Sequence, residues 1–221
     1  MAPRIINRGG STHHESYTVR LSRRYLIITT VTSTPAVVRS WIYHTCRIHG
    51  FRLHKLVVGL GVQWRPVGRY RNWSRAATLQ LCVGHRCLIF QLVYVHSVPQ
   101  ALRKFLANTN ITFVGIWNNL DAKYLQRDHG LYVHDLLDLR SCVGETDGRW
   151  DLKQASMGTL ALEFLGISGL DKDTTVGRSD WEALLLDDDQ VLYACTDAFV
   201  SFEIGKRLRL WEFRSRLHIG E

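Results

Sequence analysis

Tyr193 and Asp197 are the first residues whose types and spacing could support chemistry. They lie four residues apart in a segment with helical character, so they share one face of a helix. Asp197 falls inside that predicted helix, where an acidic residue has low propensity. A carboxylate in such a position must be solvated, paired or bound to a cation. The plainer interpretation is an ordinary exposed acid beside an ordinary tyrosine.

Asp121 is the second candidate. It is the only acidic residue between Glu15 and Asp128, in a region rich in arginine. It lies in the first turn of a helix predicted over residues 119–129, directly after a buried strand predicted over residues 111–117. In open α/β sheets, ligands bind beyond the carboxyl ends of strands, which is where Asp121 would lie. The alternative is an acid that only stabilises the helix start through the helix dipole.

Gly61 and Gln63 belong to the segment 57–66, VVGLGVQWRP. The short apolar run, rich in β-branched residues, predicts a central strand buried on both faces. Residues two apart on a strand lie on the same face, so Gly61 and Gln63 share one. Taken alone, this strand predicts no chemistry.

The remaining segments predict the elements that must position these residues. Apolar periodicity and turn residues indicate strands over 15–20, 25–31, 78–83, 86–93 and 136–139, and helices over 34–49, 99–106, 152–165 and from Asp187 to about Phe213. Thr34 and Pro35 form a typical helix start. We therefore expect a single α/β domain with a mixed sheet over residues 15–216. Residues 1–14 are expected to be a flexible N-terminus and residues 217–221 a C-terminal tail.

The charge is distributed unequally along the chain. Residues 1–127 hold 18 Lys and Arg but two acids, a net charge of +16, whereas residues 128–221 hold 10 Lys and Arg and 18 acids, a net charge of −8. A basic half attracts polyanions such as nucleic acid, although a solvated basic face would look the same. No apolar run approaches the roughly 20 residues that cross a bilayer, so we expect no membrane partner.

Five cysteines without a CxxC pair and an N-terminus without an apolar core indicate free thiols and no secretion signal. We therefore expect the cytoplasm, the nucleus or both.

The segment 65–75, RPVGRYRNWSR, combines arginines with aromatic residues. Such a combination can follow a single-stranded backbone and stack its bases. The candidate nucleic-acid-binding residues are Arg65, Arg69, Tyr70, Arg71, Trp73 and Arg75. The alternative is a surface loop that arginine keeps soluble.

Four segments together resemble a known family: VVGLGVQWRP, TLQLCVGHRCLIFQL, FVGIWNNLDAKYL and SDWEALLLDDDQVLYACTDAFVSFEIGKRL. In this order they resemble the Werner-syndrome-type 3'–5' exonucleases of the DEDDy type, and among these the small single-domain proteins of plants. The resemblance covers about residues 53–210. It implies a ribonuclease-H-like (DnaQ-like) fold, with a mixed central sheet flanked by helices.

The resemblance also implies a catalytic site. In the family, four carboxylates hold two divalent metal ions, about 4 Å apart, that drive phosphodiester hydrolysis. Asp121 and Asp197 match two of these metal-binding acids, and Tyr193 matches the tyrosine that orients the attacking water. The first motif differs, because Gly61 and Gln63 stand where the family has Asp and Glu. Mg2+ or Mn2+ is therefore expected if the site is active, and otherwise no bound metal.

The sequence thus predicts a 3'–5' exonuclease-family protein that binds or trims RNA or single-stranded DNA, with activity weak or lost. The alternative is a catalytically inactive nucleic-acid-binding subunit or scaffold that modulates active relatives. Closed rings among small plant relatives suggest a homo-oligomer, or a mixed oligomer with an active relative.

Overall fold

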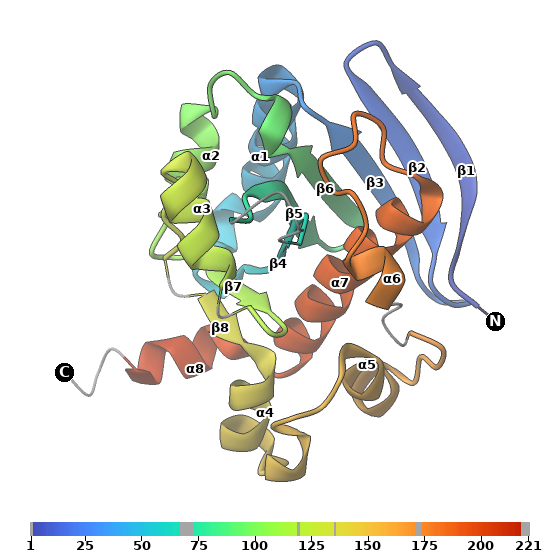
Figure 1. The fold of residues 1–221 in the computed structure, drawn as a ribbon. Helices are drawn as coiled ribbons and strands as arrows, with labels where there is room; N and C mark the ends of the chain where they lie inside the picture. The colour runs from blue at the N-terminus through green and yellow to red at the C-terminus, as the bar shows by residue number, and fades with distance from the viewer. Residues whose placement is uncertain (1, 67–72, 119, 135, 171–173, 218–221) are drawn as a thin grey trace.

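The structure is a computed structural model of the 221-residue chain. It describes all residues except 1, 67–72, 119, 135, 171–173 and 218–221, and for residues 214–217 it describes the backbone but not the side chains. Its described strands form one eight-stranded sheet in the order β1-β2-β3-β6-β5-β4-β7-β8 (Figure 1). The strands are β1 (Arg4–Ser11), β2 (His14–Arg20), β3 (Leu26–Thr32), β4 (Val57–Trp64), β5 (Ala76–Val83), β6 (Arg86–Gln91), β7 (Thr112–Gly115) and β8 (Leu136–Asp138).

Strand β4, which carries Gly61 and Gln63, lies between β5 and β7 in the sheet. It pairs antiparallel with β5 and parallel with β7, and β7 pairs parallel with β8. Seven of its eight residues are buried, in agreement with a β-branched strand covered on both faces. The predicted mixed α/β sheet and the predicted central strand are confirmed.

Helices cover both faces of this sheet. They are α1 (Pro35–His49), α2 (Gln100–Leu106), α3 (Asp121–His129), α4 (Leu139–Asp147), α5 (Met157–Leu165), α6 (Thr174–Gly177), α7 (Asp188–Arg207) and α8 (Leu210–Leu217), with 3-10 turns η1 (Gly50–Lys55), η2 (Leu92–Tyr94) and η3 (Trp150–Leu152). Aromatic contacts join α1 and α2 to one face of β7, through Trp41, Phe105 and Phe113. The long helix α7 covers the opposite face.

Gly59 allows α7 to lie directly against β4. A Cβ atom at this position would come 1.9 Å from the carbonyl oxygen of Ala198 and 2.7 Å from the backbone nitrogen of Phe202. Those distances are far inside van der Waals contact, so only glycine permits this approach. The close packing fixes which turns of α7 face the strand, and Asp197 lies on one of them.

The N-terminal segment differs from its prediction as a flexible stretch. Residues Arg4–Ser11 form β1, which pairs antiparallel with β2 along its length. Its residues are mostly exposed, and its two apolar residues, Ile5 and Ile6, are adjacent, so it shows none of the hydrophobic alternation by which a strand is recognised. Backbone hydrogen bonds to β2 hold it at the edge of the sheet.

The C-terminal helices also differ from prediction. The single helix expected from Asp187 to about Phe213 is α7 followed by α8, separated at Leu208 and Arg209. Arg209 has a φ of 53°, which a helix cannot include. Helix α4 was not predicted, and the helix expected over residues 152–165 begins only at Met157. The predicted start of the last helix is confirmed, because Asp187 and Gln190 form a capping box.

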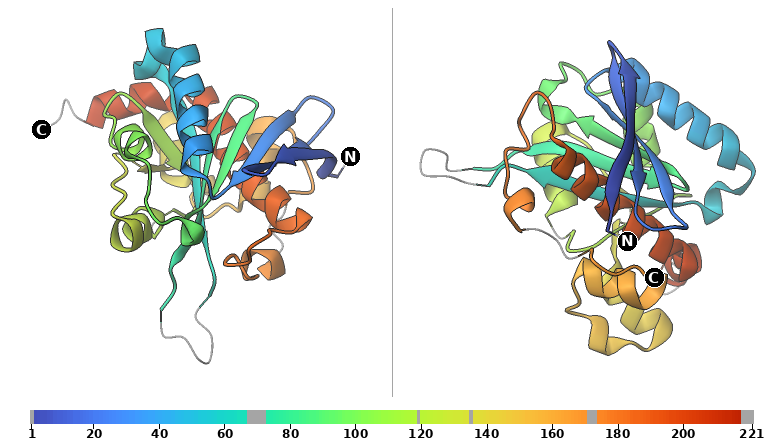
Figure 2. Two further views of the ribbon diagram at one scale, coloured as in Figure 1. Left: turned by 90° about the horizontal axis from the view of Figure 1, so that it is seen from above. Right: turned by 90° about the vertical axis from the view of Figure 1, so that its right-hand side faces the viewer.

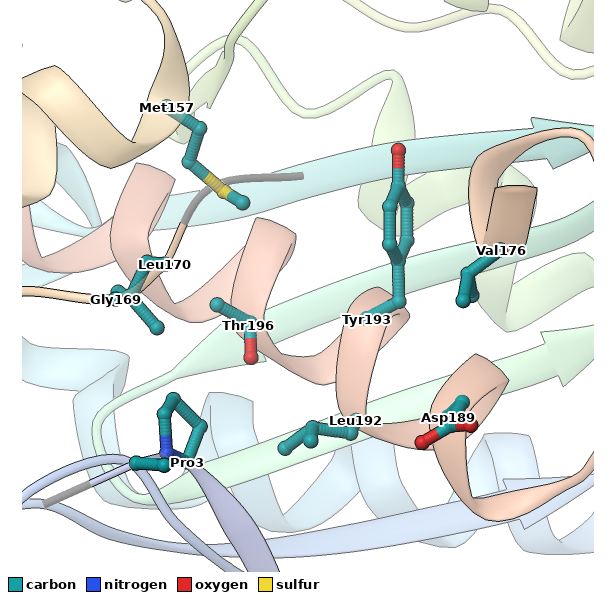
Figure 3. Close-up of a pocket in the computed structure, with 10 residues that line it drawn as sticks. Pro3, Met157, Gly169, Leu170, Val176, Asp189, Leu192, Tyr193 and Thr196 are labelled. Atoms are coloured by element: carbon teal, nitrogen blue, oxygen red, sulfur yellow. The ribbon is translucent and has the colours of Figure 1, made fainter. Parts of the chain in front are cut away.

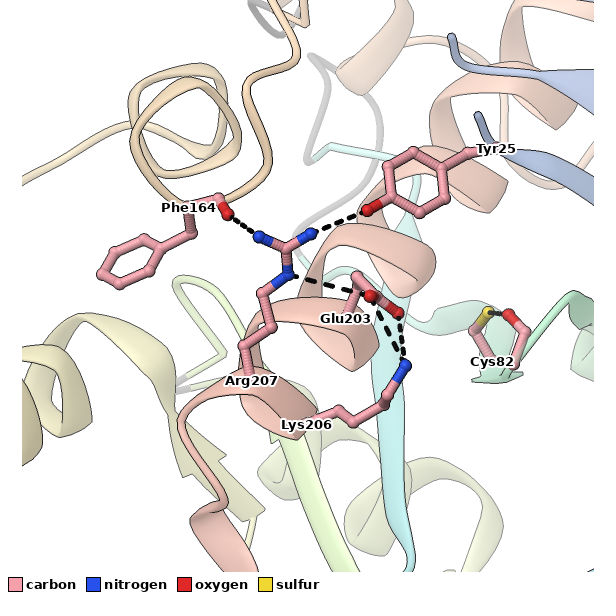
Figure 4. A network of polar contacts seen from close by, with 7 residues as sticks. Tyr25, Cys82, Phe164, Glu203, Lys206 and Arg207 are labelled. Carbon is pink, nitrogen blue, oxygen red and sulfur yellow. Dashed lines mark hydrogen bonds and ion pairs between the residues drawn. The ribbon is translucent and has the colours of Figure 1, made fainter. Parts of the chain in front are cut away.

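A polar network ties the C-terminal end of α7 to two other parts of the fold (Figure 4). The Arg207 guanidinium donates hydrogen bonds to the Phe164 carbonyl and, at 2.8 Å, to the Tyr25 hydroxyl. Arg207 and Lys206 both pair with Glu203, at 3.7 and 3.2 Å. The network joins α5, the connection between β2 and β3, and α7.

The described part of the chain holds no helix with the length and apolar character that crossing a membrane requires.

Candidate functional site

Gly61 and Gln63 lie on the face of β4 that meets α7. A Cβ atom at position 61 would lie 3.4 Å from Oδ2 of Asp197 and 2.8 Å from Oε1 of Gln80. Gln63 donates from Nε2 to the same Asp197 oxygen at 3.4 Å. Both positions therefore border the carboxylate of Asp197. They lie two residues apart on one strand, and the alternation of strand side chains predicts that such residues share a face.

Helix α7 carries Asp197 and Tyr193 one turn apart. Asp197 is 6% exposed, so the predicted interior acid is largely withdrawn from bulk water. Tyr193 packs against Trp181, which is fully buried, with the ring centroids 5.8 Å apart. Its hydroxyl lies beside Gly177, where a Cβ atom would be 2.8 Å from the oxygen. The short helix α6 is thereby set against the tyrosine.

Asp121 begins α3, just beyond the carboxyl end of β7. Its backbone nitrogen donates to the Asn118 carbonyl at 3.0 Å, and its side chain is largely buried. The side chain of Asn118 in turn donates to the Leu137 carbonyl at 2.9 Å, which anchors the connection to β8. The acid thus stands where ligands bind in open α/β sheets, beyond the carboxyl end of a strand.

One cavity of about 380 Å³ brings these side chains together. Gln63, Asp121, Tyr193 and Asp197 all line it. The sequence-predicted residues therefore converge on one place, although their roles in chemistry stay predictions. The cavity also reveals residues that the sequence did not single out for it, among them Trp117 and Arg178. They come from irregular connections, where no spacing marks them.

Tyr193 borders a second cavity as well, of about 320 Å³. Figure 3 shows its ring rising from α7, with Thr196 and Leu192 on the same helix and Val176 nearby. Met157 and Pro3 contribute further walls. Tyr193 therefore lies at the boundary between two cavities, one lined by Asp121 and Asp197 and the other lined by Asp189 together with apolar residues.

The residues present do not fit a two-metal site with four carboxylates. Gly61 contributes no ligand, and the Gln63 amide presents a hydrogen-bond donor to Asp197 where a metal ligand would present a lone pair. Within the described ranges, no group of three or more His, Cys, Asp and Glu residues has an arrangement that could hold a metal ion. Asp121 and Asp197 are the acids that remain at this cavity.

The predicted nucleic-acid-binding loop is described only at its two ends. Arg65 pairs with Asp180 at 3.2 Å while staying half-exposed, and Trp73 is 53% exposed. Arg69, Tyr70 and Arg71 lie outside the described residues. Trp73 and Arg75 line a separate cavity, whereas Pro66 lines the cavity of Asp197. Strands β4 and β5 reach out from the rest of the fold toward this loop (Figure 2).

Comparison with known proteins adds a family match. The model of a family described as 3'-5' exonuclease matches residues 51–210. The chain is 32% identical over 156 residues to the mouse bifunctional 3'-5' exonuclease/ATP-dependent helicase WRN, covering 69% of this chain and 11% of that protein. It is 28% identical over 156 residues to an Arabidopsis thaliana 3'-5' exonuclease, covering 69% of this chain and 52% of that protein. The chain thus matches only part of each relative's length.

Solved structures show the same fold. Escherichia coli RNase D, an exoribonuclease involved in structured RNA processing, superposes with a TM-score of 0.65 at 17% identity, over 84% of this chain and 45% of that chain. Brucella melitensis NrnC with bound Mg2+ superposes with a TM-score of 0.56 at 19% identity, over 73% of this chain and 77% of that chain. At these identities the likeness concerns the fold.

Proposed function

Because the chain belongs to the 3'-5' exonuclease family, we propose that it binds RNA or single-stranded DNA at the cavity of Asp121, Tyr193 and Asp197, with hydrolysis weak or lost. One observation carries the proposal: the β4 face that meets Asp197 holds Gly61 and Gln63 and no carboxylate. Similarity to mouse WRN and the Arabidopsis exonuclease supports placing the chain in the Werner-type branch.

The charge of the site decides between strong and weak metal binding. Two opposite unit charges 4 Å apart attract each other by about 4 kcal/mol at an effective dielectric of 20. A pair of carboxylates therefore attracts a dication several kcal/mol less strongly than four would. Without that cation, Asp121 and Asp197 weaken the binding of a substrate phosphate at this cavity, since like charges repel.

Other residues favour contact with a nucleic acid. Arg178 lines the same cavity and supplies a positive charge that suits a phosphate. Residues 1–127, which include β4 and the arginine-rich segment 65–75, carry the net positive charge of the chain. Backbone attraction of this kind is independent of base sequence and weakens with salt.

The first experiment measures trimming and binding together. Purified protein is incubated with 5'-labelled single-stranded RNA or DNA in Mg2+ or Mn2+, and Asp197→Asn is the matched control. We expect no more 3'-end trimming by the wild type than by Asp197→Asn, together with oligonucleotide binding that weakens as salt rises. Processive trimming that Asp197→Asn abolishes would contradict the loss of activity. Absence of binding at low salt would instead favour a scaffold.

A second experiment tests the arginine-rich loop. Replacement of Arg69, Arg71 and Arg75 with Ala should weaken oligonucleotide binding and flatten its salt dependence by about 0.7 in slope for each phosphate that the protein no longer neutralises. An unchanged slope would show that this segment is a solvated surface loop that does not contact the nucleic acid. The basic η1 turn offers the control, because Arg52→Ala removes an exposed arginine that lines neither cavity of Tyr193.

A further inference from the structure

Trp117 has an unusual backbone conformation. Its φ is 59°, and only Trp117 and Arg209 combine a positive φ with a side chain among the residues that the structure describes. The left-handed region is unfavourable for a bulky residue, because the Cβ atom crowds the backbone. Conformations of this kind persist where the surroundings enforce them, and they are concentrated at functional sites.

Arg140 and Asp138 are the surroundings that fix the Trp117 side chain. The guanidinium carbon of Arg140 lies 3.4 Å from the centroid of the Trp117 ring, which places the cation on one face of the indole. Arg140 is itself held by Asp138, through Nε to Oδ1 at 3.0 Å and Nη2 to Oδ2 at 2.6 Å. The bidentate pair sets the plane of the guanidinium, and the stacked indole follows that plane.

About half of Trp117 stays open to solvent. It is 52% exposed, and it lines the cavity that also holds Asp121, Tyr193 and Asp197. A tryptophan that served only the core would bury its ring, because the indole gains most by leaving water. Here the fold instead maintains an unfavourable φ to hold a rigid, half-exposed aromatic surface beside the cavity.

We propose that Trp117 is a stacking platform for the nucleobase of the 3'-terminal nucleotide that enters the cavity. The proposal rests on the proposed function, nucleic-acid binding at this cavity. Bases stack on aromatic side chains regardless of their identity, since every base has a π-face. A platform already fixed by Arg140 loses little conformational entropy when the base arrives. RNA and DNA share this chemistry, so the experiment includes both.

The test removes the base and the platform separately. Four 5'-labelled ten-nucleotide strands are used, RNA and DNA, each with an intact or an abasic 3'-terminal residue. We expect the wild type to bind the abasic strands roughly 5- to 100-fold more weakly than the intact ones. Trp117→Ala should bind both weakly, with less than about a twofold difference between them. Trp117→Phe, which keeps an aromatic face, should retain most of the wild-type ratio.

The ratio within each variant is the readout, because a partly unfolded preparation lowers the affinity for both strands equally. Trp150→Ala provides the control, since Trp150 is 56% exposed and lies outside the cavity, and it should keep the wild-type ratio. A wild-type ratio in Trp117→Ala would overturn the platform while leaving nucleic-acid binding intact. A wild type that binds none of the four strands at low salt would overturn the proposed function and the platform together.

Discussion

Helix α7 carries two largely buried carboxylates, Asp197 and Glu203, and the structure surrounds them in opposite ways. Glu203 is 9% exposed and lies between two cations, Lys206 at 3.2 Å and Arg207 at 3.7 Å. Asp197 is 6% exposed and accepts a hydrogen bond from the neutral amide of Gln63 beside a cavity. Burial of an acid therefore does not identify a site by itself, and the chemistry of its neighbours does.

The contrast extends to what each carboxylate does for the fold. The cations around Glu203 also bind elsewhere, since Arg207 reaches Tyr25 and Phe164. That network is structural, because it joins three segments of the chain. The Asp197 side of α7 faces Gly61, where a Cβ atom would lie 3.4 Å from Oδ2 of Asp197. The C-terminal end of the helix maintains the fold, and its middle borders the cavity.

The largest effect is expected at Gly59, which sets the approach of α7 to β4 between these two acids. Gly59→Ala would place a Cβ atom 1.9 Å from the Ala198 carbonyl oxygen, so the helix must move away. We expect a loss of about 3 kcal/mol or more in the free energy of unfolding, measured by urea denaturation.

Gly61→Ala is the matched control, two residues along the same strand. Its Cβ atom would meet Oε1 of Gln80, the far end of a flexible side chain, at 2.8 Å. A loss of no more than about 1 kcal/mol is expected, because a side chain yields more readily than a backbone. Equal losses in the two variants would show that α7 does not approach β4 as closely at Gly59 as the structure has it.

The second prediction concerns a variant in which the two neutral residues of β4 beside Asp197 are replaced with acids. Gly61→Asp combined with Gln63→Glu should raise Mn2+ affinity by at least about 100-fold, since each added carboxylate attracts a dication by a few kcal/mol at moderate dielectric. Isothermal titration calorimetry measures the gain. Without metal the variant should be less stable than the wild type, because the new acids lie against Asp197, and Mn2+ should raise its melting temperature.

The matched control for this variant adds Asp197→Asn to the two substitutions. It removes one original acid and should lose most of the gain in Mn2+ affinity. New trimming of single-stranded RNA or DNA by the double variant would show that Asp121, Tyr193 and Asp197 remain competent. If the double variant binds Mn2+ no better than the wild type, positions 61 and 63 do not correspond to the family acids.

The sequence predicted the fold best where local signals agree with burial. The β-branched run predicted β4 to within two residues, and Pro35 and Gly50 bounded α1. Two features carried no local signal. Strand β1 lies at an exposed edge and lacks apolar alternation, and the break between α7 and α8 falls at Leu208 and Arg209, where there is neither Gly nor Pro.

The candidate site was predictable to the extent that its residues lie on regular elements. Asp197 and Tyr193 share a helix face, Gly61 and Gln63 share a strand face, and the packing of α7 on β4 brings the two faces together. Trp117 and Arg178 enter the cavity from irregular connections. Their positions depend on how distant segments pack, such as Arg140 against Trp117, and no spacing along the chain encodes that.

The third prediction concerns Glu203. Glu203→Gln keeps the shape of the side chain but removes the charge that neutralises Lys206 and Arg207. We expect a loss of about 1–2 kcal/mol in the free energy of unfolding, moderated because both cations are partly exposed. Lys206→Gln should cost less, since Lys206 is the more exposed cation. Oligonucleotide binding should stay unchanged in both variants, because this network does not line the cavity of Asp197.

The smallest effect on stability is expected from Asp197→Asn. This variant tests whether Asp197 differs from Glu203 in its contribution to folding. The new amide keeps the volume of the carboxylate, and rotation of the Gln63 amide would let its oxygen accept from the new donor. We expect a change within about 0.5 kcal/mol in urea denaturation, because the new amide can keep a hydrogen bond to Gln63, whereas Glu203→Gln removes a charge that pairs with two cations. A loss as large as that of Glu203→Gln would make Asp197 a structural acid too. Asp197 would then be explained by folding alone, and it would no longer support a functional site at this cavity.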